Sequence, residues 1–296
     1  MTASTEQLER FKIAVSPERR EFNLAEAALL VAQDSDASVD VTNWLAQLDV
    51  LALPLAARLP PDAAPIHRVL SLNRYLFEEL NFRGNDEQYY DPKNSLLHEV
   101  IARRVGIPIT LSIVYMEIGR RIGLKLSGVS FPGHFLVKMR VSGGELVLDP
   151  YSQGRALSEE DLRARLESVS QGAGQGLDPR TVPIEDLIET APPRQILARL
   201  LRNLKAIYVD RQDWANALNV QNRMVILLPD ALEERRDRGL IYEKLECPRA
   251  AADDLEAYLA KVVKIPNARK TAEDEDSIAD LRARSKALRE QAAKLN

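Results

Sequence analysis

The chain has 296 residues, 45% of them hydrophobic and 28% charged, which is the balance of a globular protein with a core and not of a disordered chain. Its net charge of −4, without a basic block, argues against nucleic acid as a partner, and its single cysteine excludes an internal disulfide. The N-terminus lacks a signal-peptide pattern and no apolar run reaches the ~20 residues that span a bilayer, so we expect a cytoplasmic protein with no membrane partner.

The first third of the chain is predicted to be mainly helical. Apolar residues at helical spacing predict two helices within residues 23–57 and a third over 65–80, which begins with a proline in its first turn. The polar segment 81–94 predicts a loop. Ser95 is then placed to cap a helix that runs to about residue 104.

The hydrophobic period changes after Gly123. The segment 110–122 is apolar on most faces, which predicts a buried helix that ends at this glycine. Two strands are predicted next, over 125–141 and 144–151, joined by a turn at Ser142-Gly143-Gly144. A charged amphipathic helix follows. Helices followed by a β-ribbon indicate an α+β fold with a small antiparallel sheet.

The glycine- and proline-rich segment 171–189 is the predicted linker between a domain over 1–170 and an all-helical region over 190–296. A weak 34-residue repeat, in which Ala217 recurs as Ala251, has the period of tetratricopeptide (TPR) helix pairs. Chance matches between ordinary helical hairpins are the alternative. Two repeats are fewer than the roughly three that stand alone, so we expect them to pack on the N-terminal part of the chain or on a terminal helix. Cys247 is expected to be a packing residue.

One pair of residues in the β-ribbon has chemical potential. His134 begins the first strand after Pro132-Gly133, and Asp149 ends the second strand before Pro150, so both lie at the end of the ribbon away from its turn. A carboxylate that orients an imidazole is the second half of a nucleophile–His–Asp arrangement. The alternative is that both are turn residues.

The run GIP-x-x-L, the FPGHF strand start and the LDP strand end, within residues 94–151, resemble the bacterial SirB-type family, which has a transglutaminase-like (papain-like) core followed by TPR-like helices. In active transglutaminase-like enzymes the nucleophilic cysteine follows a glycine and an aliphatic residue and precedes a helix-ending glycine by about fifteen residues. Both anchors place it at Pro108, which has no nucleophilic atom. The resemblance implies that His134 matches the imidazole and Asp149 the carboxylate that orients it.

Other residues near this position stay open as candidates. A slip of two or four residues reaches the hydroxyls of Thr110 and Ser112, which need a base such as His134. Asn94, Pro108 and Gly133 are candidate binding residues. His98 either faces the same cleft or is bonded within the fold.

Three functions follow from these observations. The missing cysteine favours a pseudoenzyme without a cofactor that binds a protein or peptide partner. A hydrolase or acyltransferase of altered chemistry would use Thr110 or Ser112 with the pair. A metal-dependent activity would use His98, His134 and Asp149 as ligands, although their spacing is not diagnostic.

Overall fold

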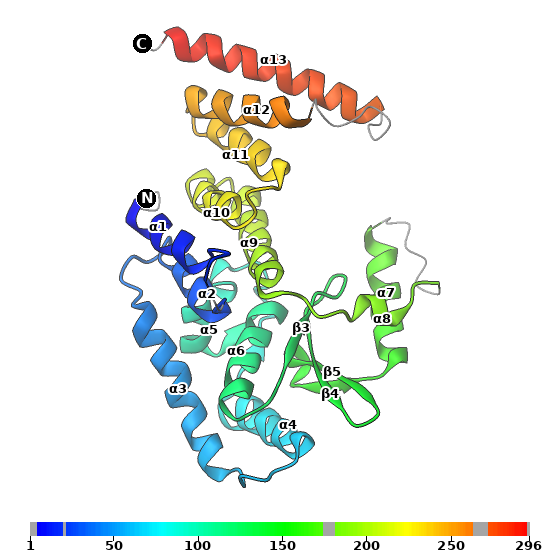
Figure 1. Cartoon of the computed structure of the whole chain (residues 1–296). Helices are drawn as coiled ribbons and strands as arrows, with labels where there is room; N and C mark the ends of the chain where they lie inside the picture. The colour runs from blue at the N-terminus through cyan, green and yellow to red at the C-terminus, as the bar shows by residue number, and fades with distance from the viewer. Residues whose placement is uncertain (1–4, 20–21, 174–180, 263–271, 295–296) are drawn as a thin grey trace. The chain divides into compact units, whose positions relative to one another are not determined.

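The computed structural model describes residues 5–19, 22–173, 181–262 and 272–294 (Figure 1). The chain forms two compact units. The core unit is Pro17–Leu200, and the helical unit is Met1–Ser16 with Leu201–Asn296. The sequence placed the division at 171–189 instead, and residues 174–180 of that segment lie outside the described residues. The predicted α+β fold followed by a helical region is confirmed.

The core unit begins with helices and is centred on the buried helix α6. Its helical elements are α2 (Leu24–Ala32), α3 (Val41–Arg58), α4 (Pro65–Asn73), the π-helical turn η1 (Arg74–Glu79), the 3-10 turn η2 (Pro92–Asn94), α5 (Leu97–Arg103), α6 (Pro108–Arg121), the 3-10 turn η3 (Pro150–Ser152), α7 (Glu159–Ala173), α8 (Ile184–Leu187) and the first turns of α9 (Pro193–Asp210). Helix α6 contacts α2 to α5, as its apolar faces predict.

The predicted cap of α5 is wrong. The helix begins at Leu97, and Ser95 lies two residues before it. Ser95 instead closes the preceding 3-10 turn through its backbone N–H, which donates to Pro92 O at 2.9 Å. The Ser95 hydroxyl is buried and has no hydrogen-bond partner among the described residues. The N-cap position of α5 is instead Leu96, whose side chain makes no capping hydrogen bond.

The sheet of the core unit is antiparallel with the order β3-β4-β5-β6, formed by β3 (Ser127–Val129), β4 (Leu136–Val141), β5 (Gly144–Asp149) and β6 (Arg155–Leu157). Ser142 and Gly143 make the predicted turn between β4 and β5. Three short strands were not predicted: β6, and the parallel pair β1 (Arg83–Gly84) and β2 (Val105–Gly106). They are only two or three residues long, too short for a periodic signal.

The sheet lies between two helical layers (Figure 1). Helix α6 packs on β3 and β4 from one side. On the other side α7 and α8 contribute Leu162, Leu166 and Ile184 to an apolar cluster with Phe131 and Val147. Both faces of the sheet are therefore covered around the open end of the β4–β5 hairpin.

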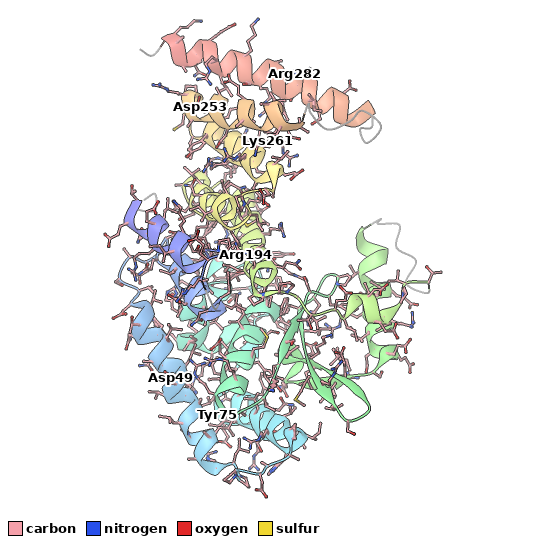
Figure 2. The ribbon with its side chains drawn as sticks, in the orientation of Figure 1. Asp49, Tyr75, Arg194, Asp253, Lys261 and Arg282 are labelled. Carbon is pink, nitrogen blue, oxygen red and sulfur yellow. The ribbon has the colours of Figure 1, made fainter. Side chains whose placement is uncertain are left out.

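Polar contacts fasten α3 to its neighbours in the core unit. Asp49 and Tyr75, labelled in Figure 2, lie on α3 and η1. Asp49 Oδ1 accepts a hydrogen bond from Arg121 Nε at 2.6 Å, and the Tyr75 hydroxyl donates to Leu51 O at 2.8 Å. The outer helix is thus tied both to α6 and to the π-helical turn.

The helical unit contains α1 (Thr5–Ala14), the rest of α9, α10 (Trp214–Leu227), α11 (Leu232–Lys244), α12 (Pro248–Val262) and α13 (Ala272–Lys294). Repeat-related Ala217 and Ala251 are both fully buried, as expected of equivalent positions. The terminal helix α13 packs on α12. Cys247 is exposed, so its predicted packing role is wrong. None of the described helices is both long and apolar enough to cross a membrane.

Candidate functional site

His134 and Asp149 form a hydrogen-bonded pair at the open end of the β4–β5 hairpin. His134 Nε2 lies 2.9 Å from Asp149 Oδ1. The hairpin register pairs Val137 with Leu148, so Asp149 lies opposite Leu136, and His134 lies in the turn just before β4, two residues earlier than Leu136. The sequence placed both residues at this end of the ribbon, and the register brings them into contact.

The Asp149 carboxylate is fully buried and accepts hydrogen bonds from four groups. Besides His134, these are Arg165 Nη2 at 2.8 Å, Ser152 Oγ at 2.8 Å and Tyr151 N at 3.0 Å. Burial by itself raises the pKa of Asp149, but the hydrogen bonds from His134 and Ser152 and the charge of Arg165 lower that pKa below its usual value. Because the ionised carboxylate only accepts, Nε2 of a neutral His134 carries the proton and Nδ1 is an acceptor, as in a general base.

A tight turn that begins at Phe131 presents His134. The His134 N–H donates to Phe131 O at 3.1 Å, and Arg199 Nη1 on α9 donates to the same oxygen at 2.9 Å. Gly133 has a φ of 65°, and a Cβ at this position would lie 2.6 Å from Val169 Cγ2 on α7. Gly133 therefore shapes the turn, because a side chain fits neither its backbone conformation nor the space.

Pro108 is the first residue of α6 and is buried. Its ring is hydrocarbon, so the position that the resemblance assigns to the nucleophile holds no nucleophilic atom. Helix α6 packs on β4 and η3, the elements beside His134 and after Asp149. A Cβ on Gly106, two residues earlier, would lie 2.7 Å from Thr110 Oγ1. Glycine at that position therefore leaves room for the threonine hydroxyl.

The two candidate hydroxyls are both inside the fold. Thr110 Oγ1 donates to Asn94 O at 2.7 Å and accepts from Ile107 N at 3.1 Å, which caps the start of α6. Ser112 is fully buried, and its hydroxyl has no hydrogen-bond partner within the described ranges. In the part of the chain that the structure describes, neither hydroxyl is hydrogen-bonded to His134.

Asn94, a predicted binding residue, is fully buried and organises the loop 85–91, called here the tyrosine loop. Its side chain bonds Gln88 O at 2.7 Å, Tyr89 O at 3.3 Å, Asn85 Nδ2 at 3.1 Å and Arg103 Nη2 at 3.0 Å. With Thr110 on its carbonyl, Asn94 also links this loop to the start of α6. Its contacts are thus those of a residue that positions others.

The Tyr151 ring packs beside the His134–Asp149 pair. Its ring lies edge-on to the His134 ring with centroids 5.9 Å apart, and it packs so closely on Gly84 that a Cβ there would lie 2.4 Å from Tyr151 Cζ. Its hydroxyl donates to Asp86 Oδ1 at 2.7 Å. Burial and this hydrogen bond raise the pKa of Tyr151. Sequence reasoning assigned no role to this tyrosine, although it directly follows the LDP motif.

His98 is packed elsewhere within the core unit. Its ring lies edge-on to Trp44 of α3 with centroids 5.9 Å apart. Burial lowers the pKa of His98, opposed by the nearby charges of Glu99 and Asp36, so its imidazole is neutral at pH 7. Among the described residues, no three His, Cys, Asp or Glu side chains gather closely enough to hold a metal ion. The geometry therefore gives no support to a site made of His98, His134 and Asp149.

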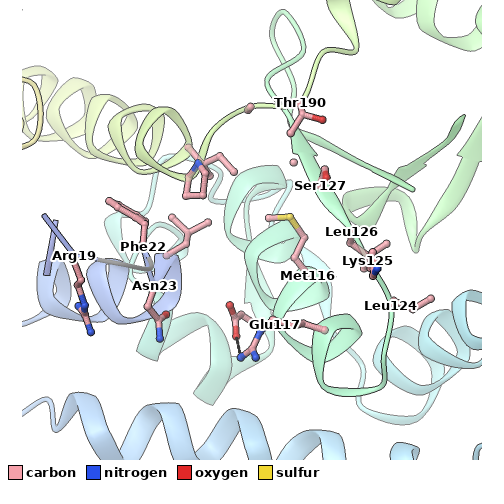
Figure 3. Close-up of a pocket in the computed structure, with 16 residues that line it drawn as sticks. Arg19, Phe22, Asn23, Met116, Glu117, Leu124, Lys125, Leu126, Ser127 and Thr190 are labelled. Carbon is pink, nitrogen blue, oxygen red and sulfur yellow. Dashed lines mark hydrogen bonds and ion pairs between the residues drawn. The ribbon is translucent and has the colours of Figure 1, made fainter. Parts of the chain in front are cut away.

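A pocket of about 740 Å³ opens between the start of α2, the second half of α6, β3 and the start of α9 (Figure 3). Phe22, Met116 and Leu126 form part of its apolar lining, and Arg120 and Lys125 lie among its charged residues. None of the residues that the sequence singled out as a site lines this pocket. It is therefore distinct from the surroundings of the His–Asp pair.

Comparisons with known proteins agree with this architecture. A family model for the transglutaminase-like superfamily matches residues 42–202, more than half of the chain, and a tetratricopeptide repeat model matches residues 204–284. The expected transglutaminase-like core followed by TPR-like helices is therefore confirmed.

Relatives in three organisms show similar sequences. A UPF0162 protein of Xylella fastidiosa (strain Temecula1) is 39% identical over 240 residues, which cover 80% of this chain and 83% of that protein. A UPF0162 protein of Pseudomonas aeruginosa is 34% identical over 236 residues, with 80% and 83% covered. Human F-box only protein 21 is 34% identical over 100 residues, 31% of this chain and 16% of that protein. The chain therefore belongs to the transglutaminase-like superfamily and, within it, to the UPF0162 family.

Proposed function

We propose that this chain is a non-catalytic transglutaminase-like and TPR protein that binds a protein or peptide partner. The observation that supports the proposal is the buried start of α6, where Pro108, the residue that the resemblance aligns with the nucleophile, has no nucleophilic atom. The nearest hydroxyl on the helix, that of Thr110, is committed to Asn94 O and Ile107 N. A site with a base but without an available nucleophile cannot perform covalent acyl transfer.

Two features support partner binding. TPR repeats stack helices into surfaces that commonly bind peptides, and such repeats match most of the helical unit. In the core unit, Tyr90 in the tyrosine loop has 72% of its surface exposed. Exposed tyrosines are enriched at protein interfaces, because a large rigid ring gives contact area at a small entropy cost.

The intact His134–Asp149 pair favours one second candidate, a hydrolase or acyltransferase that uses Thr110 or Ser112. His134 Nδ1 is placed as an acceptor, as a general base requires. For Thr110 to act as a nucleophile, its hydroxyl must give up the 2.7 Å hydrogen bond that it donates to Asn94 O. Ser112 would first have to become accessible, since it is fully buried.

Covalent labelling separates the two candidates. The purified full chain is treated with ester- and amide-directed electrophiles such as a fluorophosphonate, and adducts are read by intact-mass spectrometry. The proposal predicts no adduct on a hydroxyl. An adduct that disappears in Thr110→Val or in Ser112→Ala, with the fold retained, would establish the second candidate instead.

Binding is tested by site-specific photo-cross-linking in cells. A photoreactive phenylalanine replaces Tyr90 in the full chain, and the matched control places it at the exposed Glu160 on α7. We expect discrete cross-linked protein species from position 90 that are absent from position 160. Identical patterns at both positions, or no cross-linked protein at position 90, would count against a partner at this surface.

A further inference from the structure

Arg199 on α9 is a half-buried cation that has no counter-ion among the described residues. Its Nη1 donates to Ser130 Oγ at 2.7 Å and to Phe131 O at 2.9 Å, and its guanidinium lies 5.7 Å from the centroid of the Phe135 ring. Within the described ranges no carboxylate lies within 4.0 Å of it, and its Nε and Nη2 have no protein acceptor. A charged group held away from water is costly unless an opposite charge accompanies it.

The electrostatics of Arg199 agree with this geometry. Burial lowers the pKa of the guanidinium, and the ionisable group that opposes this effect is the phenol of Tyr89. Arginine nevertheless stays charged at neutral pH. The neutral Tyr89 beside it supplies a hydroxyl donor and no charge, because burial raises the pKa of that phenol. The part of the chain that the structure describes therefore supplies no negative charge that compensates Arg199.

The tyrosine loop carries an exposed aromatic pair, and Tyr89 of this pair interacts electrostatically with Arg199. Tyr89 and Tyr90 lie edge-on to each other with ring centroids 5.3 Å apart, and 36% and 72% of their surfaces are exposed. The buried amide of Asn94 bonds the backbone of this loop at Gln88 and Tyr89. The loop is thus held in place before any ligand arrives, which reduces the entropy cost of binding.

We propose that Arg199, with the Tyr89 hydroxyl, recognises a carboxylate side chain of an acidic peptide segment at this surface. The proposal rests on the proposed binding function and names the chemistry of its partner. The free Nε and Nη2 atoms form the planar fork that pairs with both oxygens of a carboxylate. A single cation matches the single negative charge of a carboxylate better than the double charge of a phosphate.

The proposed site is coupled to the His134 turn through one atom. Phe131 O accepts hydrogen bonds from both Arg199 Nη1 and the His134 N–H. A carboxylate that binds the guanidinium therefore changes the hydrogen bond from Arg199 Nη1 to Phe131 O, and with it the hydrogen bonding of the His134 turn. The amide resonance of His134 therefore gives a second signal for binding at Arg199, from a group that does not contact the ligand.

The test is an NMR titration of the full chain with two blocked tripeptides, Ala-Glu-Ala and Ala-Gln-Ala, which differ only in the charge of the central residue. The Arg199 Nε–H resonance is assigned by its loss in Arg199→Lys. We expect a saturable shift of this resonance and of the His134 amide with the glutamate peptide and none with the glutamine peptide. Added salt should weaken the effect, because screening reduces a partly exposed ion pair.

Variants decide whether the shift reports this site. Arg199→Lys loses the fork and should weaken binding of the glutamate peptide about tenfold, the factor expected for a charge-assisted hydrogen bond. Tyr89→Phe should weaken it about threefold, because one neutral hydrogen bond is lost. The matched control is Arg163→Gln, which removes an exposed arginine of α7 that pairs with Glu159.

Equal shifts with both peptides, or unchanged affinity in folded Arg199→Lys, would overturn the proposal. If Arg199→Lys does not fold, two results together would overturn the proposal. These are an unchanged affinity of Tyr89→Phe for the glutamate peptide and equal shifts with the two peptides. The tripeptides need no cellular partner. A negative titration therefore refutes carboxylate recognition alone, while the labelling and cross-linking experiments test the proposed function separately.

Discussion

Restoring a thiol at the start of α6 tests whether this position belongs to a degenerate catalytic site. The change is Pro108→Cys in a Cys247→Ser background, which removes the exposed native thiol. The introduced thiol begins a 14-residue helix that packs on the strand next to His134. A helix N-terminus and a neighbouring imidazolium both stabilise a thiolate.

The expected magnitude follows from these two contributions. An ordinary cysteine has a pKa of about 8.5, and catalytic cysteines paired with histidine at a helix N-terminus reach about 3.5–7.5. The helix alone contributes about 0.3–1 kcal/mol, which is less than about one pKa unit. Burial at residue 108 acts in the opposite direction and raises the thiol pKa. We therefore expect a thiol pKa of about 5–7 at residue 108. A value this low requires that the imidazole of His134 stabilise the thiolate.

The assay is the pH dependence of alkylation by iodoacetamide, because the pKa, and not the rate at one pH, reports the environment. A thiolate of lower pKa is also a weaker nucleophile, so rates at pH 7 change little. The matched control is Pro65→Cys, since Pro65 also begins a helix, α4, but is exposed and far from the pair in sequence. His134→Gln in the Pro108→Cys chain removes the imidazole. Equal thiol pKa values at residues 108 and 65, or no effect of His134→Gln, would refute the alignment of Pro108 with the nucleophile.

Three further predictions concern the stability of the core unit. Asp149→Asn should lower the free energy of unfolding at pH 7 by about 2–4 kcal/mol, because Arg165 and three other donors lose an ionised acceptor. The folded-state pKa of Asp149 is lowered, so its contribution is present above the unfolded value of about 3.9 and is lost as pH falls through the folded pKa. His98→Phe should reduce the pH dependence of stability below about pH 6.5, because the unfolded chain takes up a proton that buried His98 resists. Gly106→Ala should cost about 1–3 kcal/mol, because its Cβ meets Thr110 Oγ1.

Urea unfolding at several pH values measures all three. The difference between wild type and Asp149→Asn should shrink below about pH 4, and a constant difference down to pH 3 would contradict the ionised, hydrogen-bonded carboxylate. For His98→Phe, a pH slope identical to that of wild type between pH 7 and 5 would show that the imidazole is protonated in the fold. A double-mutant cycle of Gly106→Ala with Thr110→Ala should give a coupling of about 1 kcal/mol, and additive effects would exclude the steric explanation.

The sequence predicted the elements with strong local signals. Apolar spacing located α2, α3 and α6, and the turn at Ser142-Gly143 located the β4–β5 hairpin. The predicted buried helix over 110–122 corresponds to α6, which begins two residues earlier, at Pro108. These predictions succeed because the interactions that decide them lie within a few residues of each other.

The rest of the candidate site depends on contacts between distant segments. Arg165 reaches Asp149 from the outer helix α7, and Tyr151 packs on Gly84, 67 positions earlier in the chain. On a charged amphipathic helix, Arg165 is indistinguishable from its solvated neighbours until the helix is packed on the sheet. Asn94 was a candidate binding residue with no assigned contacts, and only the fold shows that its amide is buried against the backbone of the tyrosine loop.

The hydrogen bonds of Asp149 also have a consequence for cooperativity. Its donors come from the turn before β4, from η3 and from α7, so that detachment of any one of these segments leaves a buried negative charge short of a partner. Partly unfolded forms of this region are therefore disfavoured, and its amide protons should exchange with solvent as one group. The carboxylate would be needed for this cooperative unfolding even in a protein that catalyses nothing.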